Sequence, residues 1–308
     1  MRKTKISFDD AGAPATILKM ACERVEGFSA LYKRYERKMT LAGRSKSTMT
    51  NYGRHIASIA LHFHTLPTEL DQDQIEDYLF MLQSREQKTP SESFFKFTVF
   101  GLRYLFKIEG LENINVELPS IESDHKLPVV LSQEEVRAMI GTCTLLKHRL
   151  MIALMYGCGL RIGELVSLKV NAIDLHRKML HVVQGKGRKD RYVPLGELLC
   201  KGIARQLEAE NPREWLFTGK DHHVPMSTRG VTWAVNEAVK RTGIKKNVTC
   251  HTLRHSYATH LLEMGLDIMS IKELLGHERI ETTLVYLHVS GNSRLTPFSP
   301  LDRLYNNI

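Results

Sequence analysis

The residues best suited to chemistry lie in one stretch, 251–289, which reads HTLRHSYATHLLEMGLDIMSIKELLGHERIETTLVYLHV. His251 and Arg254 are spaced i and i+3, so they share a helix face near its N-terminus, where a phosphate is also favoured. His277 and Tyr286 follow beside predicted helix joints. This combination predicts a site that handles a phosphate group, with the hydroxyl of Tyr286 as the nucleophile.

Three short helices separated by two sharp joints are expected to position these groups. Apolar residues recur at helical spacing through each part of the stretch. Gly265 should end the first helix, Asp267 should cap the second and Gly276 should end it. Thr282 or Thr283 is the expected cap of the third helix.

Two upstream segments carry further polar groups. GLRIGE at 159–164 opens a short helix after the strongly apolar helix predicted at 145–156. GKGRK at 185–189 lies in the turn between two predicted strands, 179–184 and 192–195.

At these three segments the sequence resembles the tyrosine recombinases, the family of phage integrases, Xer-type resolvases and integron integrases. ALMYGCGLRIGELVSL, VVQGKGRKDRYVPL, HTLRHSYATHLLEMG and ELLGHERIETTLVYLHV match its motif regions in the expected order. The match covers the second predicted domain nearly end to end. A helical first domain resembles the family's core-binding domain through weaker motifs.

The resemblance implies a complete set of catalytic residues. Two arginines would clamp the scissile phosphate, a hairpin lysine and two histidines would assist, and a tyrosine would be the nucleophile. These residues are Arg161, Lys186, His251, Arg254, His277 and Tyr286, with Glu164 as a supporting acid.

The chemistry of these side chains agrees with those roles. Two guanidinium groups match the charge and geometry of a phosphodiester in transition. A phenol has a pKa of about 10, so it needs a base, and either His251 or His277 can take its proton or bond to the phosphate. A lysine can protonate the leaving 5′-hydroxyl. The cluster carries its own positive charge, so we expect no metal, cofactor or ATP requirement.

The length of 308 residues suggests two domains. We expect an N-terminal extension at 1–26, a helical core-binding domain at 27–112, a linker at 113–130 and a catalytic domain at 131–308. A capping box of Ser132 and Glu135 marks the start of the last. The expected fold is mainly α with a small antiparallel β-hairpin, and the two domains would form a clamp around duplex DNA.

The net charge of +9 and the pI near 9.3 point to a polyanionic partner. Residues 24–54 hold eight Lys/Arg against two acids, which is either a DNA-backbone surface or a solvated basic face. The candidate DNA contacts are Lys33, Arg34, Arg37, Lys38, Arg44, Lys46, Arg54, Arg188 and Lys189.

Other classes of protein are disfavoured. The five cysteines are scattered without zinc-like spacing, which indicates reduced thiols in the cytosol. His251, His255 and His260 could form a zinc site, but no carboxylate or cysteine completes a ligand set. No apolar run reaches about 18 residues and no signal peptide is evident, so we expect a soluble cytoplasmic protein without membrane contact.

The function that follows is site-specific cutting and rejoining of DNA through a 3′-phosphotyrosyl intermediate, in integration, excision or resolution. The family pattern implies a homotetramer, or a paired recombinase, on two DNA sites, with the tail 290–308 packed on a neighbour. Two alternatives remain at this point. They are a nicking-closing enzyme like the type IB topoisomerases and a non-catalytic DNA-binding regulator.

Overall fold

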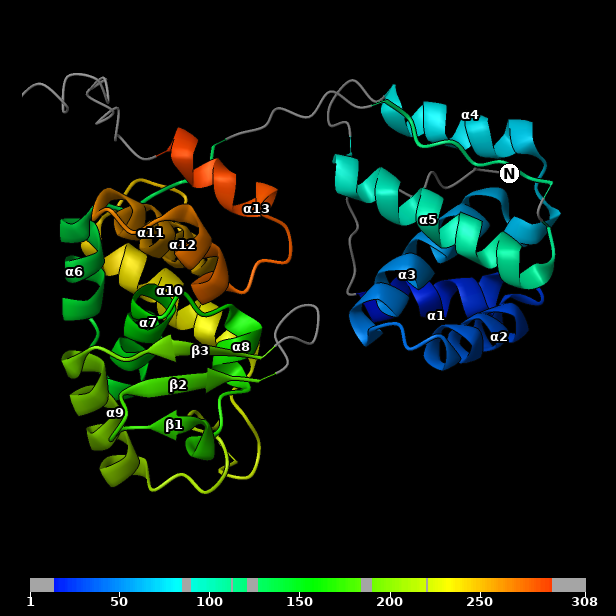
Figure 1. The fold of residues 1–308 in the computed structure, drawn as a ribbon. Coiled ribbons are helices and arrows are strands. Elements are labelled where there is room, and N and C mark those ends of the chain that lie inside the picture. The colour runs from blue at the N-terminus through cyan, green and yellow to red at the C-terminus, as the bar shows by residue number, and fades with distance from the viewer. Residues whose placement is uncertain are drawn as a thin grey trace, which may run out of the picture. The chain divides into compact units, whose positions relative to one another are not determined.

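The chain folds into two compact units, Met1–His125 and Lys126–Ile308 (Figure 1). The structure is a computed structural model that describes residues 14–84, 90–111, 113–120, 127–183, 190–219 and 221–289. The predicted fold class is confirmed, because the described chain is mainly helical with one small antiparallel sheet. Within these residues, no helix combines the length and the apolar character that a membrane span requires.

The first unit is a set of helices around a core rich in aromatic side chains. Side chains of Ser45, Asp71 and Ser91 accept backbone N–H groups at the starts of three of its helices. The core is formed by apolar residues at helical spacing on each element. The elements are α1 (Pro14–Arg24), α2 (Phe28–Leu41), α3 (Lys46–Phe63), η1 (Pro67–Glu69), α4 (Gln72–Gln83) and α5 (Glu92–Glu109).

Helix α1 belongs to this core. Its residue Ala21 is fully buried, and Val25, just beyond the helix, is nearly so. Both lie in one apolar cluster with residues of α2 and α3, including Phe28 and Ile56. The segment just before the predicted core-binding domain therefore contributes to the packing of the first unit.

The second unit consists of helices and a three-stranded sheet, and its helix α11 (Cys250–Glu263) is largely buried. The sheet has the order β1-β2-β3 with antiparallel pairing, and its paired residues Leu180 and Val193 are both fully buried. The capping box of Ser132 and Glu135 is confirmed. The elements are α6 (Gln133–Gly141), α7 (Leu146–Gly157), α8 (Ile162–Val166), η2 (Val170–Ala172), β1 (Ile173–Asp174), β2 (Met179–Val182), β3 (Arg191–Pro194), α9 (Glu197–Glu210), α10 (Thr228–Thr242), α11 (Cys250–Glu263), α12 (Ile268–Leu275), α13 (Glu281–Leu284) and η3 (Val285–His288).

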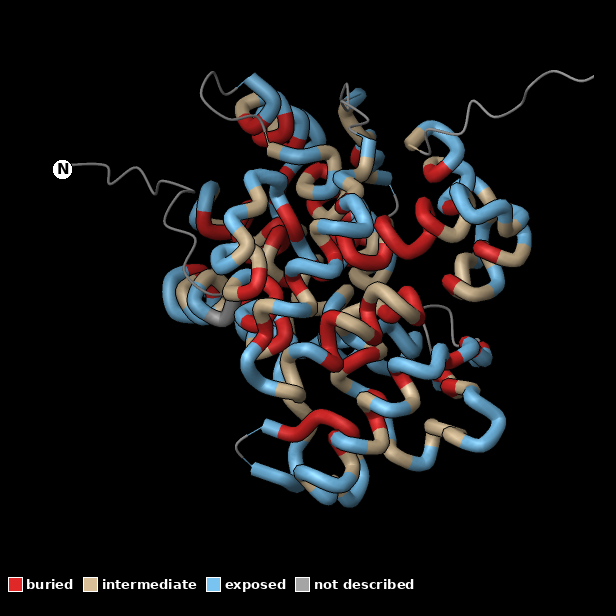
Figure 2. Tube along the Cα trace, turned by 90° about the vertical axis from the view of Figure 1, so that its left-hand side faces the viewer, coloured by how far each residue is buried: buried red, intermediate tan, exposed pale blue. Residues whose placement is uncertain are grey.

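Helix α11 packs against α7, and nine of its fourteen residues are buried. Figure 2 shows the buried stretches of the chain in red. The helix buries polar residues as well as apolar ones, including Arg254, Ser256 and His260. A buried polar side chain is costly unless it is hydrogen-bonded, so α11 must find partners on the elements around it. Ser256 bonds to the backbone N–H of Leu131 and His260 to Tyr156, and the partners of Arg254 lie in the candidate site.

The predicted joints of the stretch 251–289 are largely confirmed. The side chain of Asp267 accepts two N–H groups at the start of α12, and Gly276 ends that helix with a φ of 62°. The predicted threonine cap of α13 is wrong. The residue before α13 is Ile280, which has helical backbone angles, and no side chain caps the helix. Thr283 is buried and bonds instead to the ring of His277.

Candidate active site

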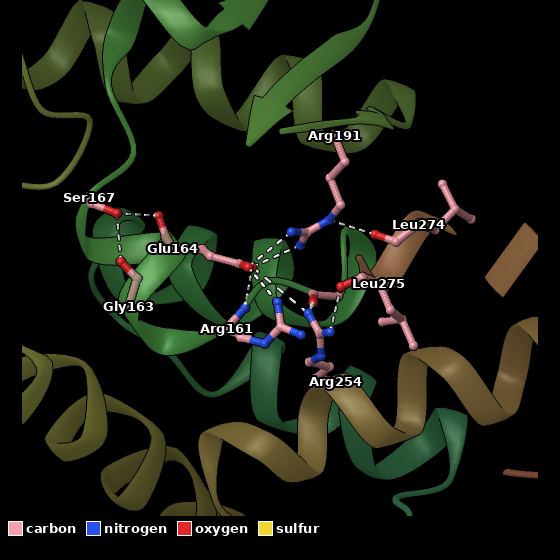
Figure 3. A network of polar contacts seen from close by, with 9 residues as sticks. Arg161, Gly163, Glu164, Ser167, Arg191, Arg254, Leu274 and Leu275 are labelled. Atoms are coloured by element: carbon pink, nitrogen blue, oxygen red, sulfur yellow. Dashed lines mark hydrogen bonds and ion pairs between the residues drawn. The ribbon is translucent and has the colours of Figure 1, made fainter. Parts of the chain in front are cut away.

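The site is built around Glu164, whose carboxylate lies among three arginines (Figure 3). Nη1 of Arg161 donates to Oε1 of Glu164 at 2.7 Å, and the backbone N–H of Arg161 donates to Oε2 at 2.9 Å. Arg191, from β3, donates to both carboxylate oxygens at 2.9 and 2.8 Å. Nη1 of Arg254 lies 3.8 Å from Oε2.

This carboxylate is ionised over the whole physiological pH range. Burial alone raises its pKa, but hydrogen bonds and charges from Arg191 and Arg161 outweigh burial and lower the pKa to about 2. One negative charge therefore lies among three positive ones. The excess positive charge can attract a phosphate, while the carboxylate fixes the guanidinium groups.

Arg254 is held from behind by backbone carbonyls. Its side chain is 4% exposed, Nη1 donates to the carbonyl of Gly159 at 2.5 Å, and Nη2 donates to that of Leu275 at 2.6 Å. Burial and then the charge of Arg161 lower its pKa to about 9, so it stays cationic at neutral pH. A bound phosphate would supply the negative charge that this buried cation lacks.

Gly159 provides one of those carbonyls from a backbone that requires glycine. Its φ is +58°, and a Cβ there would lie 2.6 Å from the ring of Tyr257 and 2.9 Å from the side chain of Leu275. Both the conformation and the space exclude a larger residue. The close approach places the Gly159 carbonyl against Arg254.

Tyr286 lies in η3 and is 1% exposed. Its Oη is 3.1 Å from Nδ1 of His255, and the two ring centroids are 5.7 Å apart. Burial raises the pKa of the phenol, whereas the charges of Arg254 and Arg161 act to lower it. The phenol is therefore protonated at neutral pH, and a base must remove its proton before it can attack.

The two predicted histidines differ in their environments. Nδ1 of His277 is hydrogen-bonded to the Thr283 hydroxyl at 2.9 Å, and burial followed by the charge of Arg254 lowers the pKa of His277 to about 3. His251 is more exposed, and partial burial together with Arg254 and Arg161 lowers its pKa. Both imidazoles are neutral at neutral pH.

The structure brings most of the predicted site residues together. Arg161, Arg254 and Glu164 share the carboxylate cluster, and the ring of His277 stacks on that of Tyr286 at 6.5 Å. His251 is exposed, and its ring centroid lies 6.5 Å from that of His255. Three predicted residues lie outside the described part of the chain, and these are Lys186, Arg188 and Lys189.

Two polar residues of the site were missed from the sequence. Arg191 stands on the buried face of β3, and the alternation of that strand was the signal that could have found it. His255 was considered only as a metal ligand, although it adjoins Arg254. Among the described residues, no three or more His, Cys, Asp or Glu side chains form a group that could hold a metal ion.

The predicted DNA-contact residues of the first unit lie on α2, α3 and the segment between them. Most are exposed, and Arg54 is half-buried. Arg34 forms a bidentate pair with Glu109 of α5 at 3.1 and 2.8 Å, so part of its charge is already matched within the unit. The other predicted contact residues of this unit keep no ion pair among the described residues, and their contact with DNA stays a prediction.

Comparisons with known proteins relate the chain to integrases and recombinases. The phage integrase family model matches residues 129–292. A putative integrase/recombinase, y4qK, of Sinorhizobium fredii is 35% identical over 89% of this chain and 89% of its own length. The tyrosine recombinase XerA of Pyrococcus horikoshii is 32% identical over 82% of this chain and 86% of its own. A crystal structure of the XerH site-specific recombinase bound to difH substrate has a TM-score of 0.64 at 19% identity, covering 95% of this chain and 92% of that one.

Proposed function

The chain belongs to the phage integrase family and is a tyrosine-type site-specific DNA recombinase, and on this premise we propose that Tyr286 is its nucleophile. The phenol oxygen forms a bond to the scissile phosphorus, and the bond from phosphorus to the 5′-oxygen breaks. The products are a 3′-phosphotyrosyl link and a free 5′-hydroxyl. Because the link keeps the bond energy, the 5′-hydroxyl of another strand can reverse the step without ATP.

The observation that carries the proposal is the position of the phenol of Tyr286 beside two fixed cations. Arg254 and Arg161 are near enough to act on its ionisation, and both are held by Glu164 or by backbone carbonyls. Cations fixed before the reaction stabilise the charge that develops on the phosphoryl oxygens without reorganisation. We assign the binding of the non-bridging oxygens to these two arginines.

The remaining roles follow from the types of side chain. We assign Lys186 to protonation of the leaving 5′-oxygen. We assign His251 and His277 to hydrogen bonds with the phosphate, which neutral imidazoles can make through a ring N–H. Glu164 positions both arginines and has no contact role with DNA.

We further propose duplex DNA as the partner of both units. Solved relatives include XerH bound to difH substrate and the Tn1549 transposon integrase in complex with circular intermediate DNA, which supports this assignment. Four protomers would hold two sites, and the reaction would occur in the cytoplasm, where the DNA substrate lies. Lysines and arginines of the first unit would contact the DNA backbone. They are the exposed Lys33, Arg34, Arg37, Lys38, Arg44 and Lys46 and the half-buried Arg54, joined by Arg188 and Lys189 of the second unit.

The test requires the DNA site that the protein reads. That site is selected from a random duplex library by binding and is then built into a nicked suicide duplex, in which cleavage releases a short strand and cannot reverse. The wild-type protein should form a covalent adduct, and Tyr286→Phe should form none. Tyr257→Phe, which removes the hydroxyl of another nearly buried tyrosine, should keep activity. An adduct with Tyr286→Phe would refute the assignment.

A further inference from the structure

We propose that His255 is the base that accepts the proton of Tyr286 during strand cleavage. The proposal rests on the assignment of Tyr286 as the nucleophile. His255 touches the reacting oxygen, which makes it a catalytic residue and not only a support for the fold.

The first argument is contact. Nδ1 of His255 and Oη of Tyr286 are hydrogen-bonded at 3.1 Å, within the range at which a base takes a proton directly. The pair joins α11 to η3, so a proton can pass between two elements that already pack together. No rearrangement of the imidazole is required to reach the hydroxyl.

The second argument is the exclusion of water. Tyr286 is 1% exposed and lies in an apolar cluster with Tyr257, Ile271 and Leu275. A buried hydroxyl cannot release its proton to bulk solvent at that position, so a side chain must take it. His255 is that side chain among the residues that the structure describes.

The other two histidines are placed for other contacts. The ring of His277 lies at 16° to that of Tyr286 with the centroids 6.5 Å apart, and its Nδ1 bonds to Thr283. The hydroxyl of Tyr286 bonds to His255. His251 lies beyond His255, with ring centroids 6.5 Å apart. Both are therefore better placed for the phosphate than for the phenol proton.

Electrostatics leave His255 able to accept the proton. The groups that face it are His251 and Arg254 of α11, Tyr286 of η3 and His277 of the segment after α12. Burial, His251 and Arg254 lower the pKa of His255, so its imidazole is neutral at neutral pH and has one nitrogen free to accept a proton. A bound phosphate offsets the charge of Arg254 and makes an imidazolium at His255 less costly.

Protons and electron pairs balance in the cleavage step. The O–H bond of Tyr286 breaks, and its proton forms an N–H bond at Nδ1 of His255. The electron pair of the phenol oxygen forms the bond to phosphorus, while the 5′-oxygen departs with the pair of the broken bond and takes a proton from the acid assigned to Lys186. On rejoining, the imidazolium of His255 returns its proton to the phenol oxygen.

The test compares two variants on two suicide duplexes. His255→Asn places an amide near Nδ1, so it can keep a hydrogen bond to the phenol but cannot take its proton. His260→Asn is the matched control, because Nδ1 of His260 bonds at 2.8 Å to the hydroxyl of Tyr156, about one and a half turns along the same helix. One duplex has the natural 5′-oxygen at the selected site, and the other has a bridging 5′-sulfur, whose thiolate leaves without an acid.

We expect His255→Asn to slow single-turnover adduct formation by about 100-fold or more on both duplexes, since general-base help is worth roughly 10²–10⁴-fold. His260→Asn should lower the melting temperature but cleave at the wild-type rate when folded. A defect of His255→Asn that disappears on the sulfur duplex would assign His255 to the leaving group and overturn the proposal. A folded His255→Asn that forms the adduct at close to the wild-type rate would overturn it also.

A rescue experiment separates chemistry from folding. Incorporation of 3,5-difluorotyrosine at position 286 lowers the pKa of the phenol, so attack needs less help from a base. The defect of His255→Asn should shrink with this residue, whereas a packing defect would persist. His255→Gln serves as a second variant if the first does not fold.

Two outcomes distinguish failure of the proposed function from failure of the base assignment. If Tyr286→Phe itself retains adduct formation, the proposed function fails. If only the His255 variants retain the full rate, the base assignment alone fails.

Discussion

Arg191 and Glu164 form a bidentate ion pair of 2.9 and 2.8 Å in the interior of the second unit. The same guanidinium donates through Nε to the carbonyl of Leu274 at 2.8 Å. One arginine therefore joins β3, the carboxylate beneath Arg161 and the C-terminal end of α12. Arg191 therefore supports Arg161 through Glu164, and it bonds to the carbonyl next to that of Leu275, which holds Arg254.

Loss of the central carboxylate should destabilise the fold. Glu164→Gln keeps the shape of the side chain but leaves the arginines around it without their negative charge. Breaking a buried ion pair costs about 3–5 kcal/mol, so the free energy of unfolding in urea should fall by that amount. Glu135→Gln is the control, because the exposed pair of Glu135 with Lys246 is worth at most about 1 kcal/mol. An equal loss in the two variants would contradict the central role of Glu164.

The free energy of unfolding should depend on pH through the carboxylate of Glu164. Its folded pKa of about 2 lies below the ordinary value of 4.5, so its contribution is complete above pH 4.5 and is lost as the pH falls toward 2. The loss over this window is about 3 kcal/mol. Urea unfolding between pH 2 and 6 should therefore show a steeper decline for wild type than for Glu164→Gln. Parallel curves would argue against the depressed pKa.

Arg254→Lys should impair chemistry more than DNA binding. Lysine cannot form the planar fork that holds the carbonyls of Gly159 and Leu275 while it faces a phosphate. We expect the single-turnover rate of adduct formation to fall by about 10²–10³-fold, with little change in the dissociation constant for the selected duplex. A variant that binds less tightly but cleaves normally at saturation would assign Arg254 to binding alone.

Gly159→Ala should be destabilising, because it combines a positive φ with contacts of 2.6 and 2.9 Å to neighbouring side chains. We expect a loss of about 2 kcal/mol or more in the free energy of unfolding, together with reduced cleavage. Gly163→Ala provides the matched control, since a Cβ at this helical position meets no atom within 4 Å. That variant should be neutral or slightly stabilising. Similar effects at the two positions would contradict the argument from backbone geometry.

The basic face of the first unit should contribute a salt-dependent part of DNA affinity. Replacement of Lys33, Arg37 and Lys38 by alanine should weaken binding to all duplexes alike. The slope of log affinity against log salt should fall by about one for each phosphate that the variant no longer neutralises. Arg34→Ala should change the slope less, because its guanidinium is paired with Glu109. Binding isotherms at several salt concentrations give the slopes for the triple variant and for Arg34→Ala. An unchanged slope in the triple variant would identify this face as merely solvated.

Much of this site could be predicted from the sequence because its residues occur in contiguous motifs with definite spacing. His251 and Arg254 share a helix start, and Asp267 and Gly276 have the backbone roles that their residue types favour. Such motifs and capping residues can be identified in a sequence without knowledge of the tertiary fold.

The rest depended on contacts between segments distant in sequence. Arg191 meets Glu164 across 27 residues, and His255 meets Tyr286 across 31. The alternation of β3 indicates that Arg191 is buried but not which residue it pairs with, and nothing local distinguishes His255 from an ordinary core histidine. The cap predicted for α13 was wrong for a related reason, since burial directs Thr283 to His277 and not to the helix start.

The segment that carries Tyr286 has little order of its own. Helix α13 has four residues and no side-chain cap, and η3 has four more, lengths at which isolated helices are not stable in water. The ring of Tyr286, packed with Tyr257 and Leu275, is therefore the anchor of this segment, and in the proposed reaction its hydroxyl is also the nucleophile. In the proposed reaction, the cleaved strand would be attached to a segment whose position depends on that packing and not on a long helix. Release of the ring from its packing would then let the strand end move toward a new partner, while the covalent bond kept it from diffusing away.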